Sequence, residues 1–463
     1  MTIKGAGHDR DRDVDVVVVG AGGGGLAAAL AVADAGRSVV VLEKLDRPGG
    51  NTALSTGSIP AAGSRLQREA GVEDSVERMV ADLLRQSGPH EAEGLTQRLS
   101  ETSADLVDWL VDEHAIRLSL ITDYKHVGHS VTRLHAPVSR RGSDLVNDLL
   151  AACTAAGVEV LVGNPATSLL VEDGRVCGVV VGGERVEEYV LRCGAVILAA
   201  NGFGANRAMI DRLIPELSPV EYFGALGSTG EALEWGLGLG GYLENASAYQ
   251  GYAAVAYPHG SLLSWTTVEK GAVIVDSTGS RLGDEILGYS GFTAEVLKGT
   301  PPSFVVYDAR IKAIAMKEEE YADLVEMGGA REYDTLDEVA DACGIDRAAL
   351  MATIEAYNSA ASGAAVDPFG RTEFGHAPLT APFVVSRVTP GLFHTQGGLA
   401  VDDDGRVLKV GGEAIPGLFA VGGVAPGISG RTGGRGYSSG NGLLSAIGLG
   451  RLAGMAAGKD VAS

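Results

Sequence analysis

The sequence predicts an α/β protein built around a parallel β-sheet. Residues 14–60 and about 130–205 alternate β-branched, strand-like runs with helical patterns, which is typical of chains that form parallel sheets. Glycine occupies 67 positions and gathers in short clusters, which suggests close approach of the backbone to a ligand. At 463 residues the chain exceeds the size at which one hydrophobic core keeps growing, so we expect two domains.

The first predicted unit is a strand, a glycine turn, a helix and a second strand that ends in an acid. Residues 14–19 read V-D-V-V-V-V, and Gly20, Gly22 and Gly25 follow at G-x-G-x-x-G spacing. The first glycine permits a tight turn, the second lets backbone approach a pyrophosphate, and the third lets helix and strand pack closely. Glu43 ends the second strand and can accept hydrogen bonds from a ribose. The unit predicts a dinucleotide site.

A second G-x-G-x-x-G match has a different context. Residues 236–241 follow a helical-looking stretch instead of a strand. We interpret this match as a structural turn. With one complete unit in the chain, nothing suggests a second, NAD(P)-binding domain.

Three further glycine-rich segments distinguish FAD from NAD. Residues 48–58 are small and hydroxylated where the phosphates and ring of a flavin would pass, and a simple NAD dehydrogenase needs no such run. Residues 195–204 and 416–423 each read as a strand that opens onto glycines. Together with the first unit, these ordered motifs resemble the fumarate reductase and 3-ketosteroid dehydrogenase flavoprotein superfamily. The resemblance covers nearly the whole chain.

The resemblance implies a Rossmann-like FAD-binding domain that is split in sequence by an α+β capping domain. We expect a flexible N-terminal tail at 1–13, the FAD-binding domain at 14–209 and 386–463, and the cap at 210–385. The residues expected at the cofactor are Gly20, Gly22, Gly25, Glu43, Lys44, Gly50, Asn51, Thr52, Ser55, Gly57, Ala200, Gly202, Gly422, Gly423, Asn441 and Leu443.

Two departures from the family pattern concern the flavin. Members that bind FAD covalently use a His after the second strand, where this chain has Asn51 and Thr52, so we expect non-covalent FAD. Many members carry a Glu at the strand-end position that Gly423 fills here.

The arginines of the fumarate reductase pattern are missing. Residues 265–282 lack the Glu and Arg of that family segment, and the stretch after Arg281 has Tyr289 where an Arg is expected. The second substrate Arg sits four residues before an Asn, and Tyr437 takes that position relative to Asn441. A dicarboxylate needs guanidinium forks, so the sequence argues against a simple dicarboxylate substrate.

The tyrosines resemble those of 3-ketosteroid Δ4-dehydrogenase-like enzymes, which desaturate a ring beside its ketone. By position, the Tyr437 O–H and the Gly442 N–H would hold the carbonyl, and Tyr289, relayed through Ser439, would be the base. Neutral donors aimed at the ketone oxygen stabilise the charge that develops there. A phenol is a poor base near neutral pH, so its pKa must be tuned or its proton relayed.

Histidines supply the remaining candidates. His394 precedes T-Q-G-G, where fumarate reductases place a substrate-contacting His, and a structural hydrogen bond is the alternative. His126, His129 and His135, together with Arg133, either line the pocket or belong to a surface loop. Their spacing is no convincing metal pattern, and we predict no metal site.

Composition restricts the partners. The formal charge of −22 repels phosphate, so we expect no nucleic acid and no anionic membrane as partner. Four separated cysteines form no C-x-x-C motif, and the polar N-terminus has no signal-like apolar core, which fits a cytoplasmic location. No haem or iron–sulfur motif is present, so oxygen, a quinone or a separate carrier must accept the electrons.

The preferred function is an FAD-dependent dehydrogenase that introduces a double bond α,β to the ketone of a cyclic substrate, steroid-like or smaller. One alternative is an ene-reductase that runs the same geometry backwards on an activated alkene. A flavin-binding protein without turnover is the other alternative.

Overall fold

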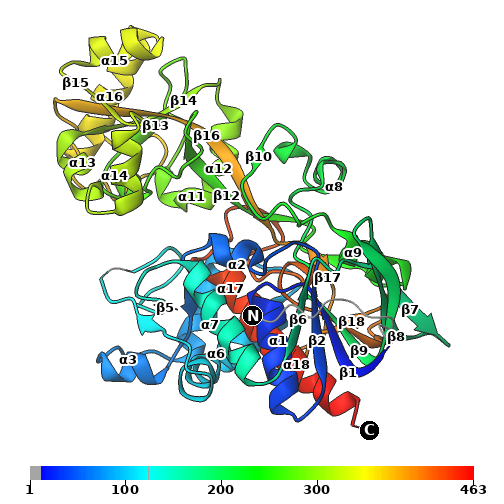
Figure 1. The fold of residues 1–463 in the computed structure, drawn as a ribbon. Helices are drawn as coiled ribbons and strands as arrows, with labels where there is room; N and C mark the ends of the chain where they lie inside the picture. Colours follow the sequence, from blue (N-terminus) through cyan, green and yellow to red (C-terminus); the bar gives the residue numbers. More distant parts are fainter. Residues whose placement is uncertain (1–11, 124, 463) are drawn as a thin grey trace.

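The computed structural model describes residues 12–123 and 125–462. Two sheets divide the molecule into two lobes (Figure 1). The predicted tail lies mostly outside the described residues, although Arg12 and Asp13 already belong to the first strand. Within the described ranges, no helix has the length and apolar character needed to cross a membrane.

The eight-stranded sheet joins segments from both ends of the chain. Its main path runs β18-β19-β9-β1-β2-β6, with β8 paired to β9 and β7 paired to β8. β1 pairs in parallel with β2 and β9, and β19 pairs in parallel with β9. The strands are β1 (Arg12–Val19), β2 (Val39–Glu43), β6 (Glu159–Val162), β7 (Ala166–Glu172), β8 (Arg175–Gly183), β9 (Val186–Leu198), β18 (Arg406–Leu408) and β19 (Ala414–Ala420).

Helices α1 (Gly23–Asp34) and α18 (Leu449–Asp460) pack together against this sheet (Figure 1). Their approach is close because a Cβ at Gly450 or Gly454 would meet the backbone of α1. A π-helix, Leu444–Gly448, and α17 (Asn441–Leu443) precede α18, so the predicted final helix begins irregularly. Beside α1 lies α7 (Gly142–Ala155), and α2 (Gly50–Leu54) follows β2 in the chain.

The predicted helical region 65–115 consists of several short helices. They are α3 (Arg65–Glu69), α4 (Val76–Ser87), α5 (Glu93–Glu101), α6 (Ser103–Asp108) and a π-helix, Trp109–Glu113. A small sheet of β3 (Ile59–Pro60), β4 (Ser119–Leu120) and β5 (Leu134–Ala136) lies near them.

The second sheet has seven strands and its own hydrophobic core. Its strands are β10 (Glu221–Tyr222), β12 (Ser247–Ala256), β13 (Val273–Val275), β14 (Ser303–Asp308), β15 (Arg331–Tyr333), β16 (Phe383–Thr395) and β20 (Thr432–Gly433). Because β12 and β16 are long, they reach from this lobe towards the first (Figure 1). β16 crosses position 385, where the sequence predicts a domain boundary. The domain limits therefore stay predictions.

The helices of the second lobe lie partly at its far end and partly beside β12, which reaches towards the first lobe (Figure 1). They are α10 (Thr266–Glu269), α11 (Gly288–Gly291), α12 (Thr293–Lys298), α13 (Ala309–Ala315), α14 (Glu319–Glu326), α15 (Leu336–Cys343) and α16 (Arg347–Ala361). The predicted helix 335–357 is two helices, since left-handed Gly344 ends α15 and the Asp346 side chain caps α16. Between the lobes in sequence lie α8 (Arg207–Leu213), α9 (Glu231–Gly238), β11 (Leu243–Glu244) and, later, β17 (Gly398–Leu399). The second G-x-G-x-x-G match ends α9.

Candidate active site

The predicted dinucleotide turn joins β1 to α1. Gly20 has φ +109°, and a Cβ on it would collide with the Ala199 backbone. A Cβ on Gly25 would strike the Gly20 oxygen, whereas the nearest atom to a Cβ on Gly22 would be 3.8 Å away. No side chain caps α1 at Gly22. The turn therefore presents a positively polarised helix N-terminus, which favours an anionic phosphate.

Glu43 ends β2 beside this turn and is 9% exposed. Its Oε2 accepts from the Ala21 N–H at 3.0 Å and its Oε1 accepts from the Leu45 N–H at 2.9 Å. Both carboxylate oxygens are fixed, and each keeps a lone pair for a further donor such as a ribose hydroxyl. Lys44 lies elsewhere: its Nζ donates to Thr229 and pairs with Glu231 at 2.8 Å. Its predicted cofactor contact remains a prediction.

The polar side chains of the α2 segment form hydrogen bonds within the segment and with the start of α1. Gly50 and Gly57 both have positive φ, and Ser55 Oγ donates to the Thr52 oxygen and accepts from the Gly57 N–H. Thr52 Oγ1 accepts from the Gly23 N–H at 3.0 Å, so this segment buttresses the first turn of α1.

Asn51 joins α2 to both lobes. Its Oδ1 accepts from the Ala225 N–H at 2.6 Å, and its Nδ2 donates to the Phe393 oxygen at 3.3 Å. At the position where covalent FAD binders carry a His, this chain therefore uses an amide as a structural link.

The strand ends at Ala200–Gly202 and Gly422–Gly423 face each other. A Cβ on Gly423 would lie 2.5 Å from Asn201 Oδ1 and 2.6 Å from the Gly202 nitrogen. A side chain at position 423 would have to displace Asn201 and the Gly202 backbone. Ala200 is half-buried beside this contact.

Buried polar atoms without partners lie next to the glycine turn. Asn441 is fully buried, yet its Oδ1 has no hydrogen-bond partner, and neither has the buried Ser445 Oγ. Leu443 is buried between them in the chain, and Ala446 packs against Gly24 of α1. Buried polar atoms normally find partners, so these two fit a bound polar group. The glycine turn, Glu43, the α2 segment and the Asn441 segment together form a cradle that suits FAD.

Four of the five predicted catalytic residues, all except His394, lie together at the junction of the lobes. Tyr289 is in α11, and its hydroxyl lies 3.4 Å from Ser439 Oγ. The rings of Tyr289 and Tyr437 cross at 6.1 Å. Burial raises the pKa of Tyr437 well above its ordinary value and nearby Tyr289 adds to this, while the backbone N–H of Gly442 beside the hydroxyl opposes it. Tyr437 is therefore a neutral donor at physiological pH, next to a backbone N–H.

Aromatic side chains that the sequence analysis did not identify form a wall beside this group. Tyr252 of β12 stacks on Tyr289 at 5.3 Å, and Trp265 meets the same ring at 6.2 Å. Phe393 of β16 lies 6.0 Å from Tyr252, and Phe223 stacks on Phe393 at 5.5 Å. The Tyr252 hydroxyl donates to the Leu263 oxygen. Rings arranged in this way suit an apolar, cyclic ligand.

His394 lies on β16 beside Phe393. Its Nδ1 accepts from Gln396 Nε2 at 2.9 Å, and burial lowers its pKa to about 4. Neutral His394 therefore carries its proton on Nε2. The structure supports a hydrogen-bonded role at this position, and a substrate or flavin contact remains a prediction.

The histidine segment is mainly interior. His129 and His135 are buried, and Arg133 is fully buried, so the surface-loop alternative is wrong for these three. His135 Nε2 lies 2.8 Å from Ser64 Oγ, and its Nδ1 lies 3.3 Å from the Ile59 oxygen. Among the described residues, no group of three or more His, Cys, Asp or Glu side chains could hold a metal ion.

Arg281, from the fumarate reductase-like segment, is held in the second core. Its Nε and Nη2 donate to Glu285 at 2.9 and 2.7 Å, and its Nη1 pairs with Asp367. Arg371 also donates to Glu285, at 2.9 Å. Arg281 is therefore committed to a buried ion-pair network.

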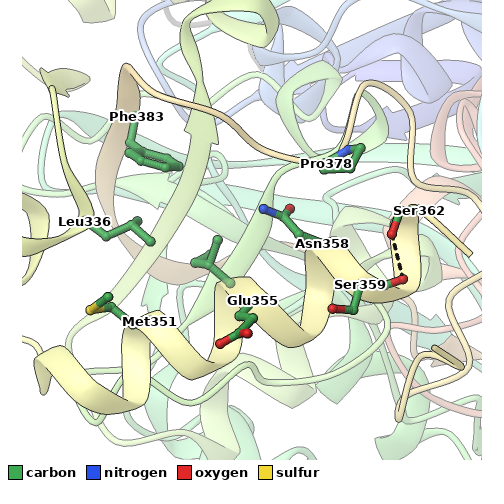
Figure 2. A pocket seen from close by; sticks show the side chains of 9 residues that line it. Leu336, Met351, Glu355, Asn358, Ser359, Ser362, Pro378 and Phe383 are labelled. Atoms are coloured by element: carbon green, nitrogen blue, oxygen red, sulfur yellow. Dashed lines mark hydrogen bonds between the residues drawn. The ribbon is translucent and has the colours of Figure 1, made fainter. Parts of the chain in front are cut away.

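A separate pocket of about 500 Å³ lies on the second lobe (Figure 2). It is open, and residues of α16, including Met351, Glu355 and Asn358, line it together with Leu336 and Phe383. None of the predicted catalytic residues lines it, so it is not the candidate active site.

Comparison with known proteins gives the family. A family model described as an FAD binding domain matches residues 15–443. The chain is 31% identical to an NADH:fumarate oxidoreductase of Klebsiella pneumoniae, over 92% of this chain but 45% of that protein, so it spans less than half that relative's length. It is 28% identical to a 4-oxocyclohex-2-ene-1-carboxylate 5-dehydrogenase of Sinomonas cyclohexanicum, over 93% of this chain and 90% of that protein.

Solved structures agree. A flavocytochrome c3 fumarate reductase in its open conformation matches with a TM-score of 0.82 and 28% identity, over 98% of this chain and 80% of that chain. The 3-ketosteroid-Δ4-(5α)-dehydrogenase of Rhodococcus jostii RHA1, in complex with 4-androstene-3,17-dione, matches with a TM-score of 0.80 and 25% identity, over 97% and 98%. The chain therefore belongs to the FAD-binding oxidoreductase family that contains fumarate reductases and 3-ketosteroid dehydrogenases.

Proposed function

We propose that this oxidoreductase introduces a double bond α,β to the ketone of a cyclic substrate, steroid-like or smaller. The observation that carries the proposal is the placement of Tyr437 and the Gly442 N–H beside Tyr289 and Ser439. This is the donor pair and proton-accepting pair that desaturation beside a ketone requires. The dehydrogenases of cyclic ketones among the relatives support the same choice.

The cradle residues would hold FAD as described above, with the glycine turn and α1 at its phosphates and Glu43 at its ribose. When bound, FAD supplies the acceptor for the hydride that leaves the β-carbon.

The protein residues would act on the carbonyl and the α-proton. Tyr437 and the Gly442 N–H donate to the ketone oxygen, and the negative charge that grows there makes the α-C–H bond more acidic. Tyr289 accepts the α-proton while its own hydroxyl proton moves to Ser439 Oγ, 3.4 Å away, and Ser439 releases its own hydroxyl proton to water. As the α-proton and β-hydride leave, the C=C bond forms. The aromatic wall orients the ring and excludes water.

The test is an anaerobic titration that follows the visible absorbance of oxidised flavin. The titrants are cyclohexanone and 5α-androstane-3,17-dione, with succinate as the control. Bleaching by a ketone and not by succinate is the expected result. Bleaching by succinate alone would contradict the proposal.

A second candidate is an ene-reductase that acts on an activated alkene, because several relatives carry fumarate reductase names. The same donor pair would polarise an enone, and Tyr289 would deliver the proton. Reoxidation of chemically reduced enzyme by enones, without bleaching by any ketone, would favour this direction.

A further inference from the structure

Both sides of the Ser439 peptide are bound by one loop in the first third of the chain. The Ser439 N–H donates to the Val127 oxygen at 3.0 Å, and His129 Nε2 lies 2.8 Å from the Ser439 oxygen. Gly128 lies between these partners with φ +84°, and a Cβ on it would collide with Ser438. The loop is therefore fitted closely to the segment that carries Tyr437 and Ser439.

Arg133 determines which nitrogen of His129 carries the proton. Its Nη1 lies 3.1 Å from His129 Nδ1. A guanidinium can only donate, so Nδ1 must accept, and the proton of the neutral ring is on Nε2, facing the Ser439 oxygen. Arg133 is itself held by Asp74, at 2.7 and 2.8 Å, and by Asp82, at 3.0 Å.

The neutral ring persists over the physiological range. Burial lowers the pKa of His129 to about 4, the carbonyl of Ser439 opposes this, and the neighbouring Arg133 charge lowers the pKa further. Protonation of Nδ1 would set an N–H against the guanidinium N–H. The donor to Ser439 is therefore fixed in one orientation.

We infer that His129, oriented by Arg133, is a positioning residue for the catalytic group, an inference that rests on the proposed function. Tyr289 comes from α11 of the second lobe, whereas Tyr437, Ser439 and Gly442 come from one C-terminal segment. The 3.4 Å contact between Tyr289 and Ser439 depends on where that segment lies. His129 fixes the segment at the Ser439 peptide, although it touches neither the substrate site's tyrosines nor the reacting atoms.

The chain offers a matched control. His135 is six residues away, is fully buried, and has a pKa that burial likewise lowers to about 4. Its contacts go to Ser64, which caps α3, and to Ile59 in the small sheet rather than to Ser439. A His135 variant therefore measures what the loss of a buried, hydrogen-bonded histidine does by itself.

The experiment compares His129→Leu, His129→Asn, His129→Gln and His135→Leu in the FAD-loaded, full-length protein. The amide of Gln reaches the position of Nε2 and can donate to Ser439, whereas the amide of Asn reaches only the position of Nδ1. Two readouts are used: the single-turnover rate of flavin bleaching by the ketones named above, and the Kd of p-chlorophenol, an enolate mimic, by titration calorimetry. Circular dichroism confirms that each variant is folded.

We expect His129→Leu and His129→Asn to lower the rate about 10- to 100-fold, because misplacement near 1 Å has effects of that size. We expect their Kd for p-chlorophenol to rise about tenfold, from the loss of one well-oriented donor group. His129→Gln should stay within about threefold of wild type, and His135→Leu should change neither readout. If His129→Leu does not fold, the difference between Asn and Gln decides.

Wild-type values in His129→Asn, or equal losses in His135→Leu, would overturn the inference while leaving the proposed function intact. Wild-type protein that no ketone bleaches, but whose phenol binding weakens in His129→Asn, would overturn the proposed function alone. Wild-type protein that neither reacts with a ketone nor binds the phenol would overturn both.

Discussion

Each lobe contains a buried arginine network, and the two networks end differently. In the second lobe, Arg281 and Arg371 share Glu285, and both guanidinium groups lie over the ring of Tyr357. Arg371 also donates to three backbone carbonyls of the same lobe, so this network is closed.

In the first lobe, Arg133 pairs with Asp74 and Asp82, and its last contact is to His129. That contact orients the His129 ring, whose Nε2 lies at hydrogen-bond distance from the Ser439 oxygen. Two sets of fully buried charges thus satisfy the same requirement for pairing, but one holds a core together and the other extends to the catalytic group. The comparison teaches that a buried arginine's function depends on where its hydrogen bonds end.

The largest expected effect is on the closed network. Glu285→Ala leaves two buried guanidinium groups without their shared partner, so the free energy of unfolding should fall by about 3–5 kcal/mol. Urea unfolding measures this change. The hydrogen bonds of Arg281 and Arg371 end on carboxylates and backbone carbonyls of the second core, so the bleaching rate per folded molecule should stay within about twofold of wild type. A rate loss as large as that of His129→Leu would remove the distinction between the networks.

A substitution in the loop that carries His129 should affect the bleaching rate more than the stability of the fold. Gly128→Ala places a Cβ against Ser438 at positive φ, which should cost about 1–2 kcal/mol of stability from the left-handed backbone. The collision should push the Ser439 segment away from Tyr289 and lower the bleaching rate about 100-fold. Gly36→Ala is the control, because its φ is +71° and a Cβ there meets nothing within 4 Å. Equal rates in both variants would contradict the link to Ser439.

Acidification should distinguish the networks, because only the first includes a histidine. The pKa of His129 is lowered by burial to about 4, below an ordinary value near 6.5. Between these values the unfolded chain binds more protons, so stability falls as pH falls from about 6.5 to about 4. Replacing His129 by Gln should reduce that slope by about 1.4 kcal/mol per pH unit. Urea unfolding at several pH values measures the slope; an unchanged slope in His129→Gln would contradict the neutral, buried assignment.

The sequence predicted the parts of the site that depend on local backbone. Gly20 and Gly25 could be predicted from the turn itself, because Gly20 adopts a positive φ and a Cβ on Gly25 would strike the Gly20 oxygen. Tyr437 and Gly442 lie in one segment, so their spacing already brings them near each other.

Parts that depend on long-range packing were missed. Tyr252 and Phe393 reach the wall through the bulged pairing of β12 with β16, which no local pattern encodes. Arg133 meets Asp74 across 59 residues, and Lys44 meets Glu231 across 187. A polar residue in a sequence does not reveal whether its partner is a ligand or a distant side chain, and only the fold decides.

The smallest effect concerns the exposed edge of the first network. Asp82 is 2% exposed and accepts from Arg133, Arg85 and Ser130. Burial would raise the pKa of Asp82, but these donors hold it well below its usual range. The Arg85 side chain is 65% exposed, so solvent screens its pairing, and Arg85→Ala should cost under about 1 kcal/mol and leave the bleaching rate unchanged. Urea unfolding and the single-turnover assay check this. A lower rate in Arg85→Ala would mean that Arg85 at the surface, and not the buried Arg133, determines the orientation of His129.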